Sequence, residues 1–336
     1  MHLSFNYEYH IFGFGQFIFA IAWRIFMAEI ATQEMRMTKT ALILGASGRF
    51  GRHAAKAFET AGWQVRRFDR KADDLHSAMA GADVTVNAMN PKSYNLWARA
   101  LLPLHARVIE AAKGTGTTLI VPGNVYVFGP DVAMPWTAHS PHRAQNPLAQ
   151  LRIRMEAMYR DAGLPVILLR CGDFIDDQKT MNWFEGFITK PLNKGRIDYP
   201  GDAGVAHSWA YLPDAARAMV MLAERRSTLA RFEDIPFEGF TMTGAELATA
   251  LTQATGKTVA AGKFDWWMLQ LLRPFAPMVR GLFEMRYLWS LPHRLDGARM
   301  AELLPDFVAT PPEVALRQAL AYRLGEAMAV EGAVPA

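Results

Sequence analysis

An apolar run that leads directly into a glycine-rich turn constrains the fold of this chain more than any other feature. The segment reads Leu42-Ile43-Leu44-Gly45-Ala46-Ser47-Gly48-Arg49-Phe50-Gly51, and a helical pattern follows over residues 53–61. Three glycines at a spacing of three allow a tight turn, a close approach of backbone to a pyrophosphate, and close packing of the helix on the strand. The first amide groups of the helix can then bind phosphate oxygens. The pattern predicts a dinucleotide site made by Gly45, Ser47, Gly48, Arg49, Phe50 and Gly51.

An acidic residue further along the chain favours a bound nucleotide over a glycine turn without a ligand. Asp69 stands at the end of the next predicted strand, 64–69, near the spacing expected for an acid that binds the adenosine ribose. Its carboxylate favours NAD, because it can accept hydrogen bonds from the ribose hydroxyls. Arg70 directly after it, and Arg49 inside the turn, can instead pair with a 2′-phosphate. These two arginines tip the prediction toward NADP, and NAD is the alternative.

Apolar runs and helical patterns alternate along the first half of the chain. Strands are predicted at 41–44, 64–69, 83–88, 118–121 and 165–170, and helices at 53–61, 73–80, 94–113 and 147–162. Within the third of these helices, Pro103 should end or kink the helix. Alternation at this rhythm predicts right-handed βαβ units. The expected fold is therefore α/β, of the Rossmann type, with a doubly wound parallel sheet.

The regular alternation of predicted strands and helices ends near Cys171, and Pro and Gly become frequent after it. A helix is predicted at 213–225, and Thr243-Gly244-Ala245-Glu246 has the pattern of a capping box that opens another helix. With 336 residues, the chain is long enough for a second lobe. We therefore expect an apolar extension at 1–37, a dinucleotide-binding core at 38–170, and a smaller C-terminal substrate lobe at 171–330 that partly returns to the core.

Composition excludes several classes of protein. Hydrophobic residues make up 51% of the chain and charged residues 20%, which excludes global disorder and allows a large core. Cys171 is the one cysteine, so no intramolecular disulfide can form, and a reducing, cytoplasmic location is expected. No Cys/His spacing resembles a zinc site, and no metal is predicted. The net charge of +4 comes without a Lys/Arg run, so nucleic acid is not expected as a partner.

Two apolar segments indicate a peripheral membrane contact as an alternative to a purely cytoplasmic location. Ile11–Trp23 is a run of thirteen uncharged residues, shorter than the ~20 that a spanning helix needs. A start at Met35 or Met37 would place the first strand at the beginning of the protein, so a misassigned start explains this run equally well. Phe264–Trp289 combines many large apolar residues with three arginines. A helix that covers the substrate lobe is the first interpretation of this segment, and a bilayer surface is the second.

Several motifs together resemble the extended and atypical short-chain dehydrogenase/reductase superfamily, in its epimerase/dehydratase and NmrA-like branches, over about residues 39–325. The glycine turn has the spacing of that superfamily, and residues 82–88 are similar to its motif at a strand end that passes the cofactor. Further similar segments are Val125-Tyr126-Val127-Phe128-Gly129, residues 169–174 and residues 209–218. The resemblance implies NAD(P) binding with contacts from Asn87 and Ala88, and a small-molecule substrate. It also allows a homodimer.

The catalytic residues of that superfamily are replaced in this chain. Its members use a Tyr and a Lys four residues apart, with a Ser or Thr from the preceding strand, to transfer a proton. The corresponding positions hold Leu148, Arg152 and Asn124. Leucine cannot transfer a proton, but arginine stays charged and could contact the ribose or a phosphate, and Asn124 could orient a carbonyl. The resemblance therefore implies cofactor or catalytic contacts from Asn124 and Arg152 without the usual proton transfer.

Other side chains could supply the proton. Tyr94 and Tyr126 follow strands that are expected to end at the cofactor. His139 and His142 lie in a Pro-rich loop, and His207 lies in the second lobe, where surface or packing roles are the alternative. We select Tyr126, with Asn124 and Arg152, as the predicted catalytic set.

The predicted function is that of an NAD(P)-dependent oxidoreductase or epimerase acting on a small carbonyl or a sugar nucleotide. A non-catalytic NAD(P)-binding regulatory or scaffold protein is the alternative, because the Tyr/Lys pair is replaced. A membrane-peripheral assembly factor is a third hypothesis, based on the two apolar segments.

Overall fold

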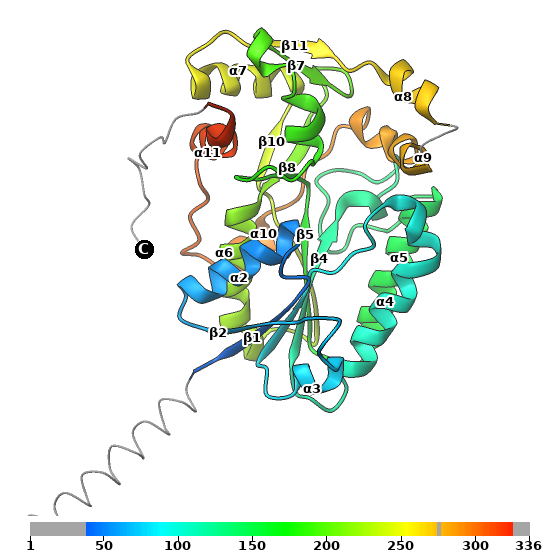
Figure 1. Ribbon diagram of the computed structural model, residues 1–336, viewed down its shortest axis with the longest axis vertical. Coiled ribbons are helices and arrows are strands. Elements are labelled where there is room, and N and C mark those ends of the chain that lie inside the picture. The colour runs from blue at the N-terminus through cyan, green and yellow to red at the C-terminus, as the bar shows by residue number, and fades with distance from the viewer. Residues whose placement is uncertain (1–37, 274–276, 325–336) are drawn as a thin grey trace, which may run out of the picture.

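Six parallel strands form the central sheet of this protein, whose computed structural model describes residues 38–273 and 277–324 (Figure 1). The predicted extension at 1–37 lies outside the described residues. The strands are β1 (Thr40–Leu44), β2 (Gln64–Arg67), β3 (Val84–Asn87), β4 (Thr118–Asn124), β5 (Val166–Cys171) and β9 (Phe232–Pro236). Their order is β2-β1-β3-β4-β5-β9. The predicted α/β fold with a doubly wound parallel sheet is confirmed.

The apolar runs of the sequence are the strands at the middle of this sheet. Every residue of β1, β3 and β5 is buried, because helices cover both faces. The chain passes from β1 to β2 on one side and then returns to place β3 on the other side of β1. Such a reversal opens a crevice at the carboxyl ends of the two central strands, where ligands bind in sheets of this kind.

Two helical layers flank the sheet. Helices α2 (Arg49–Thr60) and α6 (Leu212–Glu224) cover one face, and α4 (Trp97–Ala112) and α5 (Pro147–Asp161) cover the other (Figure 1). The short α3 (Leu75–Met79) lies beside α4. Each layer buries the apolar stripe of its helices, as with Phe50, Ala54 and Phe58 of α2. These layers fix the start of α2 against the end of β1.

Pro103 does not end its helix as the sequence predicted. Helix α4 continues through it from Trp97 to Ala112. Pro103 is exposed, whereas Leu101 and His105 on either side are buried. Water can therefore bind the carbonyl group that the proline leaves without an intrahelical donor, while packing on the buried face keeps both halves of the helix in place.

The second lobe contains two small sheets and several helices above the carboxyl ends of the main strands (Figure 1). One sheet has the order β10-β8-β6, and the other pairs β11 with β7. Their bounds are β6 (Asp173–Ile175), β7 (Arg196–Tyr199), β8 (His207–Tyr211), β10 (Phe240–Met242) and β11 (Ala260–Lys263). The helices are α7 (Gly244–Thr255), α8 (Trp266–Leu272), α9 (Pro277–Glu284) and α11 (Pro312–Leu324). Helix α10 (Ala298–Leu303) instead packs beside β9 in the core, where Met300 joins the apolar cluster of α2 and α6. Both halves of the predicted capping box are present at the start of α7. Strand β9 and helix α6 return to the core, so the lobe is not a separate sequence block.

Short helical turns complete the structure and place several candidate residues. They are η1 (Tyr94–Leu96), η2 (Val125–Val127), η3 (Phe184–Ile188), η4 (Leu192–Lys194), η5 (Arg226–Thr228) and η6 (Arg286–Trp289). Turn η1 follows β3 and turn η2 follows β4, so both lie at the carboxyl edge of the sheet. Among the residues that the structure describes, no helix has the length and hydrophobicity needed to cross a bilayer.

Candidate cofactor and substrate site

The glycine turn between β1 and α2 leaves no space for side chains. Gly45 has φ +78°, and a Cβ there would lie 3.2 Å from the backbone of Ala88. A Cβ at position 51 would lie 2.2 Å from the carbonyl oxygen of Gly45. The amide of Gly48 closes the turn by donating to that same oxygen at 2.9 Å. The predicted roles of the first and third glycines therefore have a direct steric basis.

The start of α2 offers free donors to an anion. Gly48 is the residue before the helix, no side chain caps it, and no acidic residue lies in the first turn. Amides at such an end point away from the helix and carry the positive end of its dipole. With the close backbone of Ala88 and no side chain at Gly45 or Gly48, this geometry fits a dinucleotide pyrophosphate.

Asp69 and Arg70 lie at the other end of the crevice, just beyond β2, and both are exposed. The Asp69 carboxylate accepts a hydrogen bond from the amide of Lys71 at 2.9 Å. One of its oxygens is thus held by the local turn, and an exposed carboxylate of this kind can still accept from ribose hydroxyls.

Arg49 lies on the side of the turn that faces the substrate lobe. Its guanidinium donates to the carbonyl oxygen of Thr180 at 2.7 Å. Burial raises the pKa of the Tyr94 phenol to about 12, and the positive charge of Arg49 acts in the opposite direction by lowering that pKa. The Arg49 guanidinium, one of the two on which the NADP prediction depended, thus contacts the substrate lobe, and its pairing with a 2′-phosphate stays a prediction.

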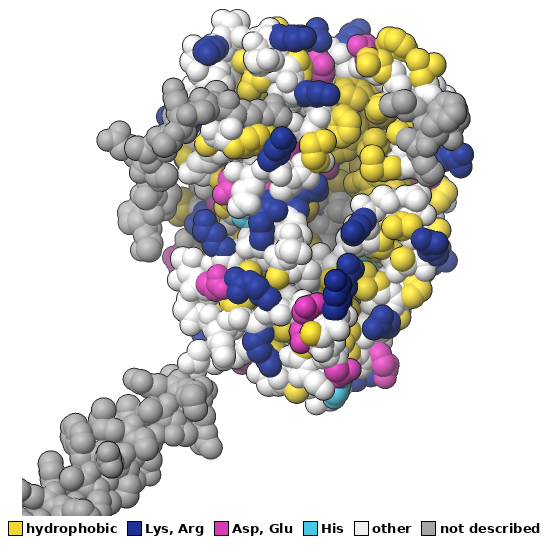
Figure 2. All heavy atoms as spheres, in the orientation of Figure 1, with side chains coloured by type: hydrophobic (Ala, Val, Ile, Leu, Met, Phe, Trp, Pro, Cys, Tyr) yellow, Lys and Arg dark blue, Asp and Glu magenta, His cyan; other side chains and the backbone are white. Residues whose placement is uncertain are grey.

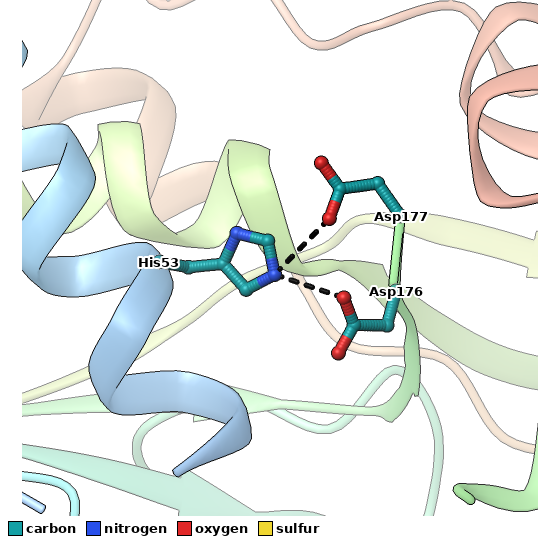
Figure 3. A group of neighbouring side chains, drawn as sticks. All are labelled: His53, Asp176 and Asp177. Atoms are coloured by element: carbon teal, nitrogen blue, oxygen red, sulfur yellow. Dashed lines mark hydrogen bonds and ion pairs between the residues drawn. The ribbon is translucent and has the colours of Figure 1, made fainter. Parts of the chain in front are cut away.

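Helix α2 holds the segment after β6 through two further basic side chains, of which Figure 3 shows His53 with its two carboxylate partners. Nε2 of His53 lies 2.9 Å from Asp176 and 3.4 Å from Asp177. Arg52 contacts the other oxygen of Asp176 at 2.5 Å. Although burial opposes it, the hydrogen bond and charge of His53, together with the charge of Arg52, lower the pKa of Asp176. We call this set, Arg52, His53, Asp176 and Asp177, the α2 latch.

Tyr94 and Tyr126 form a hydroxyl pair at the carboxyl edge of the sheet. Their oxygens lie 2.7 Å apart. Burial raises the pKa of both phenols, that of Tyr94 to about 12, and the negative charge of Asp173 raises both further. Both hydroxyls therefore keep their protons at neutral pH. Sequence reasoning proposed each tyrosine singly, and the structure brings them together.

The three positions of the replaced catalytic set lie beside this pair. Leu148 is buried. Arg152, also buried, donates to the carbonyl oxygen of Pro122 at 3.1 Å, and its guanidinium lies 5.7 Å from the centre of the Trp97 ring. Asn124 uses its side-chain oxygen to accept from the amide of Tyr126 at 3.1 Å. Arg152 thus acts on Tyr126 through its charge. Asn124 holds the backbone of Tyr126 in place through its hydrogen bond.

Asn87 and Ala88 have different surroundings, although they are neighbours. The backbone of Ala88 lies against Gly45 and lines the turn. The side chain of Asn87 is buried, and its nitrogen lies 2.8 Å from the hydroxyl of Tyr159 and 3.2 Å from Nδ1 of His105. The Asn87 amide nitrogen thus faces the α4–α5 layer, so a contact with the cofactor from this residue rests on its backbone.

A buried ionic cluster that the sequence did not reveal lies behind the site. Arg170 contacts Glu156 at 2.8 Å and Asp234 at 2.5 Å, and it donates to the backbone oxygen of Asn124 at 2.6 Å. Burial opposes the charge of Arg170, but the two carboxylates raise its pKa above its usual value. His142 lies at the edge of this cluster, and burial lowers its pKa to about 4. Its role is therefore in packing, and it is a poor proton donor at neutral pH.

The remaining histidine candidates divide between the surface and the second lobe. His139 is exposed in its loop. His207 is buried, and its Nε2 lies 2.8 Å from Asp173. Its ring stacks on Trp289 with the centroids 4.0 Å apart, and it meets His293 edge-on at 4.4 Å. Asp173, which links His207 electrostatically to the two tyrosines, was missed because its sequence neighbours give no signal of the contact.

Two groups of His and carboxylate side chains in the described part of the chain have metal-ligand spacing. They are the His53, Asp176 and Asp177 group and the His142, Glu156 and Asp234 group. In each group an arginine guanidinium contacts a carboxylate, from Arg52 in the first and from Arg170 in the second. These cations balance the carboxylates as a metal would, so we assign no metal to either group.

A Rossmann-type sheet with a glycine turn at its switch point defines a dinucleotide-binding protein. The chain belongs to the NAD dependent epimerase/dehydratase family, whose family model matches residues 41–235. A comparison with curated protein sequences gives no match.

Solved structures share the fold over most of the chain. MoeE5 in complex with UDP-glucose and NAD is 14% identical with a TM-score of 0.65, covering 86% of this chain and 99% of its own. A nucleoside-diphosphate-sugar epimerase from Pseudomonas aeruginosa is 17% identical with a TM-score of 0.64, covering 86% and 98%. UDP-N-acetylglucosamine 4-epimerase from Bacillus cereus is 13% identical with a TM-score of 0.64, covering 85% and 100%. These similarities show that the fold is shared over most of the chain, including much of the second lobe.

Proposed function

We propose that this protein binds NAD or NADP at the glycine turn and reduces, or reversibly oxidises and reduces, a small carbonyl compound or a sugar nucleotide. The observation that carries the proposal is the Tyr94–Tyr126 hydroxyl pair, with oxygens 2.7 Å apart, beside the position of the replaced Tyr/Lys pair. Family membership and the sugar-nucleotide ligands named for similar structures support the substrate class.

The tyrosine pair suits the role of an acid. Bound NAD(P)H would supply the hydride in such a reaction. Because burial keeps both phenols protonated, Tyr126 can give its proton to a carbonyl oxygen as that oxygen gains negative charge. The hydroxyl of Tyr94 can then pass a proton to Tyr126 along their hydrogen bond, and Tyr94, which is only partly buried, would regain a proton from water. The nearby charge of Arg152, which favours the phenolate form of both tyrosines, eases this transfer.

Asp69 and Arg70 set the choice between the two cofactors. Arg49 is engaged with Thr180, so Arg70 is the arginine left beside Asp69. This supports NAD over the NADP that the sequence favoured. Fluorescence titration of the full-length protein with NADH and with NADPH tests the choice. In Arg70→Gln, the affinity for NADPH should change little if NAD is the preferred cofactor. It should fall at least tenfold if Arg70 binds a 2′-phosphate.

The replaced pair also supports a second function, that of a non-catalytic NAD(P)-binding regulatory or scaffold protein. Leu148 is buried and cannot exchange a proton, and Arg152 is hydrogen-bonded to backbone. Dinucleotide binding without turnover over a panel of carbonyl compounds and sugar nucleotides would favour this function over an enzyme.

Substitution of the hydroxyl pair tests the enzymatic proposal. We expect Tyr126→Phe to lower kcat at least about 100-fold, the usual effect of removing a general acid, with little change in dinucleotide affinity. Tyr94→Phe should lower kcat less than Tyr126→Phe does, because only the proton transfer from Tyr94 to Tyr126 is lost. Tyr159→Phe is the matched control, since its hydroxyl is also buried and hydrogen-bonded but faces Asn87 and His105. Turnover that survives in Tyr126→Phe would refute the assignment.

A further inference from the structure

Helices α8 and α9 expose large apolar side chains that the site does not use. Among the described residues, four of the eight exposed large hydrophobic side chains lie on these two helices: Trp267, Met268, Leu271 and Met278. Trp267 is 63% exposed and Leu271 65% exposed. Hydrophobic side chains gather over these helices in the upper right of Figure 2, with basic side chains at the edge. We call these four residues the α8–α9 patch.

The exposed side chains form a distinct face of α8. Positions 267 and 268 lie on one side of the helix with 271, since residues three and four positions apart are neighbours on a helix surface. Trp266 points the other way into the lobe core, where its ring lies 5.2 Å from that of Phe264 and 5.3 Å from that of Phe283. Helix α8 is therefore anchored by one apolar face and presents a second apolar face to the outside.

Exposed arginines on or just after α8 and α9 determine which occupant the patch suits. Arg273, Arg280 and Arg286 are all exposed. The guanidinium of Arg273 lies 5.6 Å from the Phe283 ring, and that of Arg286 lies 4.9 Å from the Trp266 ring. Trp and Leu on a face bordered by arginines form the pattern of a segment that lies on an anionic bilayer, with rings among the acyl chains and guanidinium groups at the headgroups.

The same charges argue against a second copy of the chain as the occupant. A two-fold interface would place the same patch on itself and bring the two sets of arginines close together. Like charges brought face to face oppose association. A bilayer containing anionic lipid supplies the opposite charge instead.

We propose that the α8–α9 patch docks this protein on the surface of an anionic membrane. The uncharged run Ile11–Trp23 of the same chain supplies a second apolar segment, and stable attachment to a bilayer generally takes two such signals. The patch also lies close to the candidate site. A Cβ at Gly281 of α9 would lie 2.4 Å from Cβ of Tyr94, and Glu284 accepts a hydrogen bond from the amide of Leu148 at 3.2 Å.

Co-sedimentation of the full-length protein with lipid vesicles tests this proposal. We expect binding to phosphatidylcholine vesicles that contain phosphatidylglycerol, and at least tenfold weaker binding to phosphatidylcholine alone. The double variant Trp267→Ser/Leu271→Ser should lose at least tenfold in partitioning to the anionic vesicles. Val308→Ser is the matched control, because Val308 is 62% exposed but lies outside the patch, and it should bind as the unmodified protein does.

A second variant makes the result independent of any effect on folding. Arg273→Gln/Arg280→Gln changes only exposed side chains and should weaken binding to anionic vesicles while leaving thermal unfolding unchanged. The proposal fails if the full-length protein does not sediment with anionic vesicles. It also fails if both double variants bind as the unmodified protein does, which would assign binding to the N-terminal run. A change in oligomeric state by light scattering, with unchanged vesicle binding, would identify the patch as an interface between copies.

Discussion

A methyl group at position 51 would lie 2.2 Å from the carbonyl oxygen of Gly45 and 2.8 Å from its carbonyl carbon. Both atoms belong to the turn that approaches the pyrophosphate, so Gly51→Ala must displace the turn or the start of α2. We expect at least a tenfold loss of dinucleotide affinity, measured by fluorescence titration with NADH and NADPH. Gly81→Ala is the control, because Gly81, unlike Gly51, has a positive φ that disfavours alanine but has nothing within 4 Å of the added Cβ. Equal affinity loss in both variants would contradict a specific role for the glycine turn.

Residues in the turn and residues around it differ in how far the sequence could predict them. Gly48 and Gly51 were predictable because both lie against the carbonyl oxygen of Gly45, only a few positions earlier in the chain. The hydrogen bond from Arg49 to the carbonyl oxygen of Thr180 could not be predicted, because the two residues are 131 positions apart. Asp173 was missed for the same reason, since its partner His207 lies 34 positions further along the chain. Local patterns carry no information on such pairings.

At the scale of elements, the α2 latch joins the helix behind the glycine turn to the segment that leads into the second lobe. The side chain of Asp176 is fully buried between Arg52 and His53, whereas that of Asp177 is 27% exposed. Asp176→Asn removes the charged partner of Arg52 and the closer of the two carboxylates beside His53, and we expect a loss of about 2 to 3 kcal/mol in the free energy of unfolding, measured with urea. Burial raises the pKa of Asp177, so Asp177→Asn should cost less than about 1 kcal/mol. Similar losses in the two variants would refute this assignment of the latch.

The sequence predicted the positions of strands and helices more accurately than it predicted the contacts between them. Buried parallel strands require continuous apolar runs, so 118–121 and 165–170 predicted β4 and β5 within a few residues. The Thr243 capping box is likewise local, and both of its hydrogen bonds are present. Helix α4 shows the limit of this approach. The sequence indicates a break at Pro103, but the packing of distant residues against the buried face of α4 decides that the helix continues.

For the whole molecule, buried histidines link stability to pH. Burial lowers the pKa of His142 to about 4 and that of His105 and His293 to about 3, from an ordinary value of 6.5. Below pH 6.5 the unfolded chain binds protons at these positions, while the folded protein does not until about pH 4 or 3. The free energy of unfolding must therefore fall as the pH falls from about 6.5 toward 4. Each histidine contributes a slope of about 1.4 kcal/mol per pH unit once its unfolded form is fully protonated.

Urea unfolding of the full-length protein at a series of pH values between 7 and 5 measures this slope. His142→Gln removes one of the three groups, so its slope should be smaller by about one third, or about 1.4 kcal/mol per pH unit at the acidic end. His142 is the histidine to replace, because its ring packs on Phe128 and its nearest carboxylate oxygen is 3.9 Å away, so the glutamine breaks no close ion pair. His139→Gln is the control, since an exposed histidine should leave the slope unchanged. A free energy of unfolding that stays constant or rises toward pH 5 would show that these histidines become protonated within the fold. Protonated His105 would then place a positive charge beside Asn87 and near Arg152. The electrostatic surroundings of the Tyr94–Tyr126 pair would therefore change with pH.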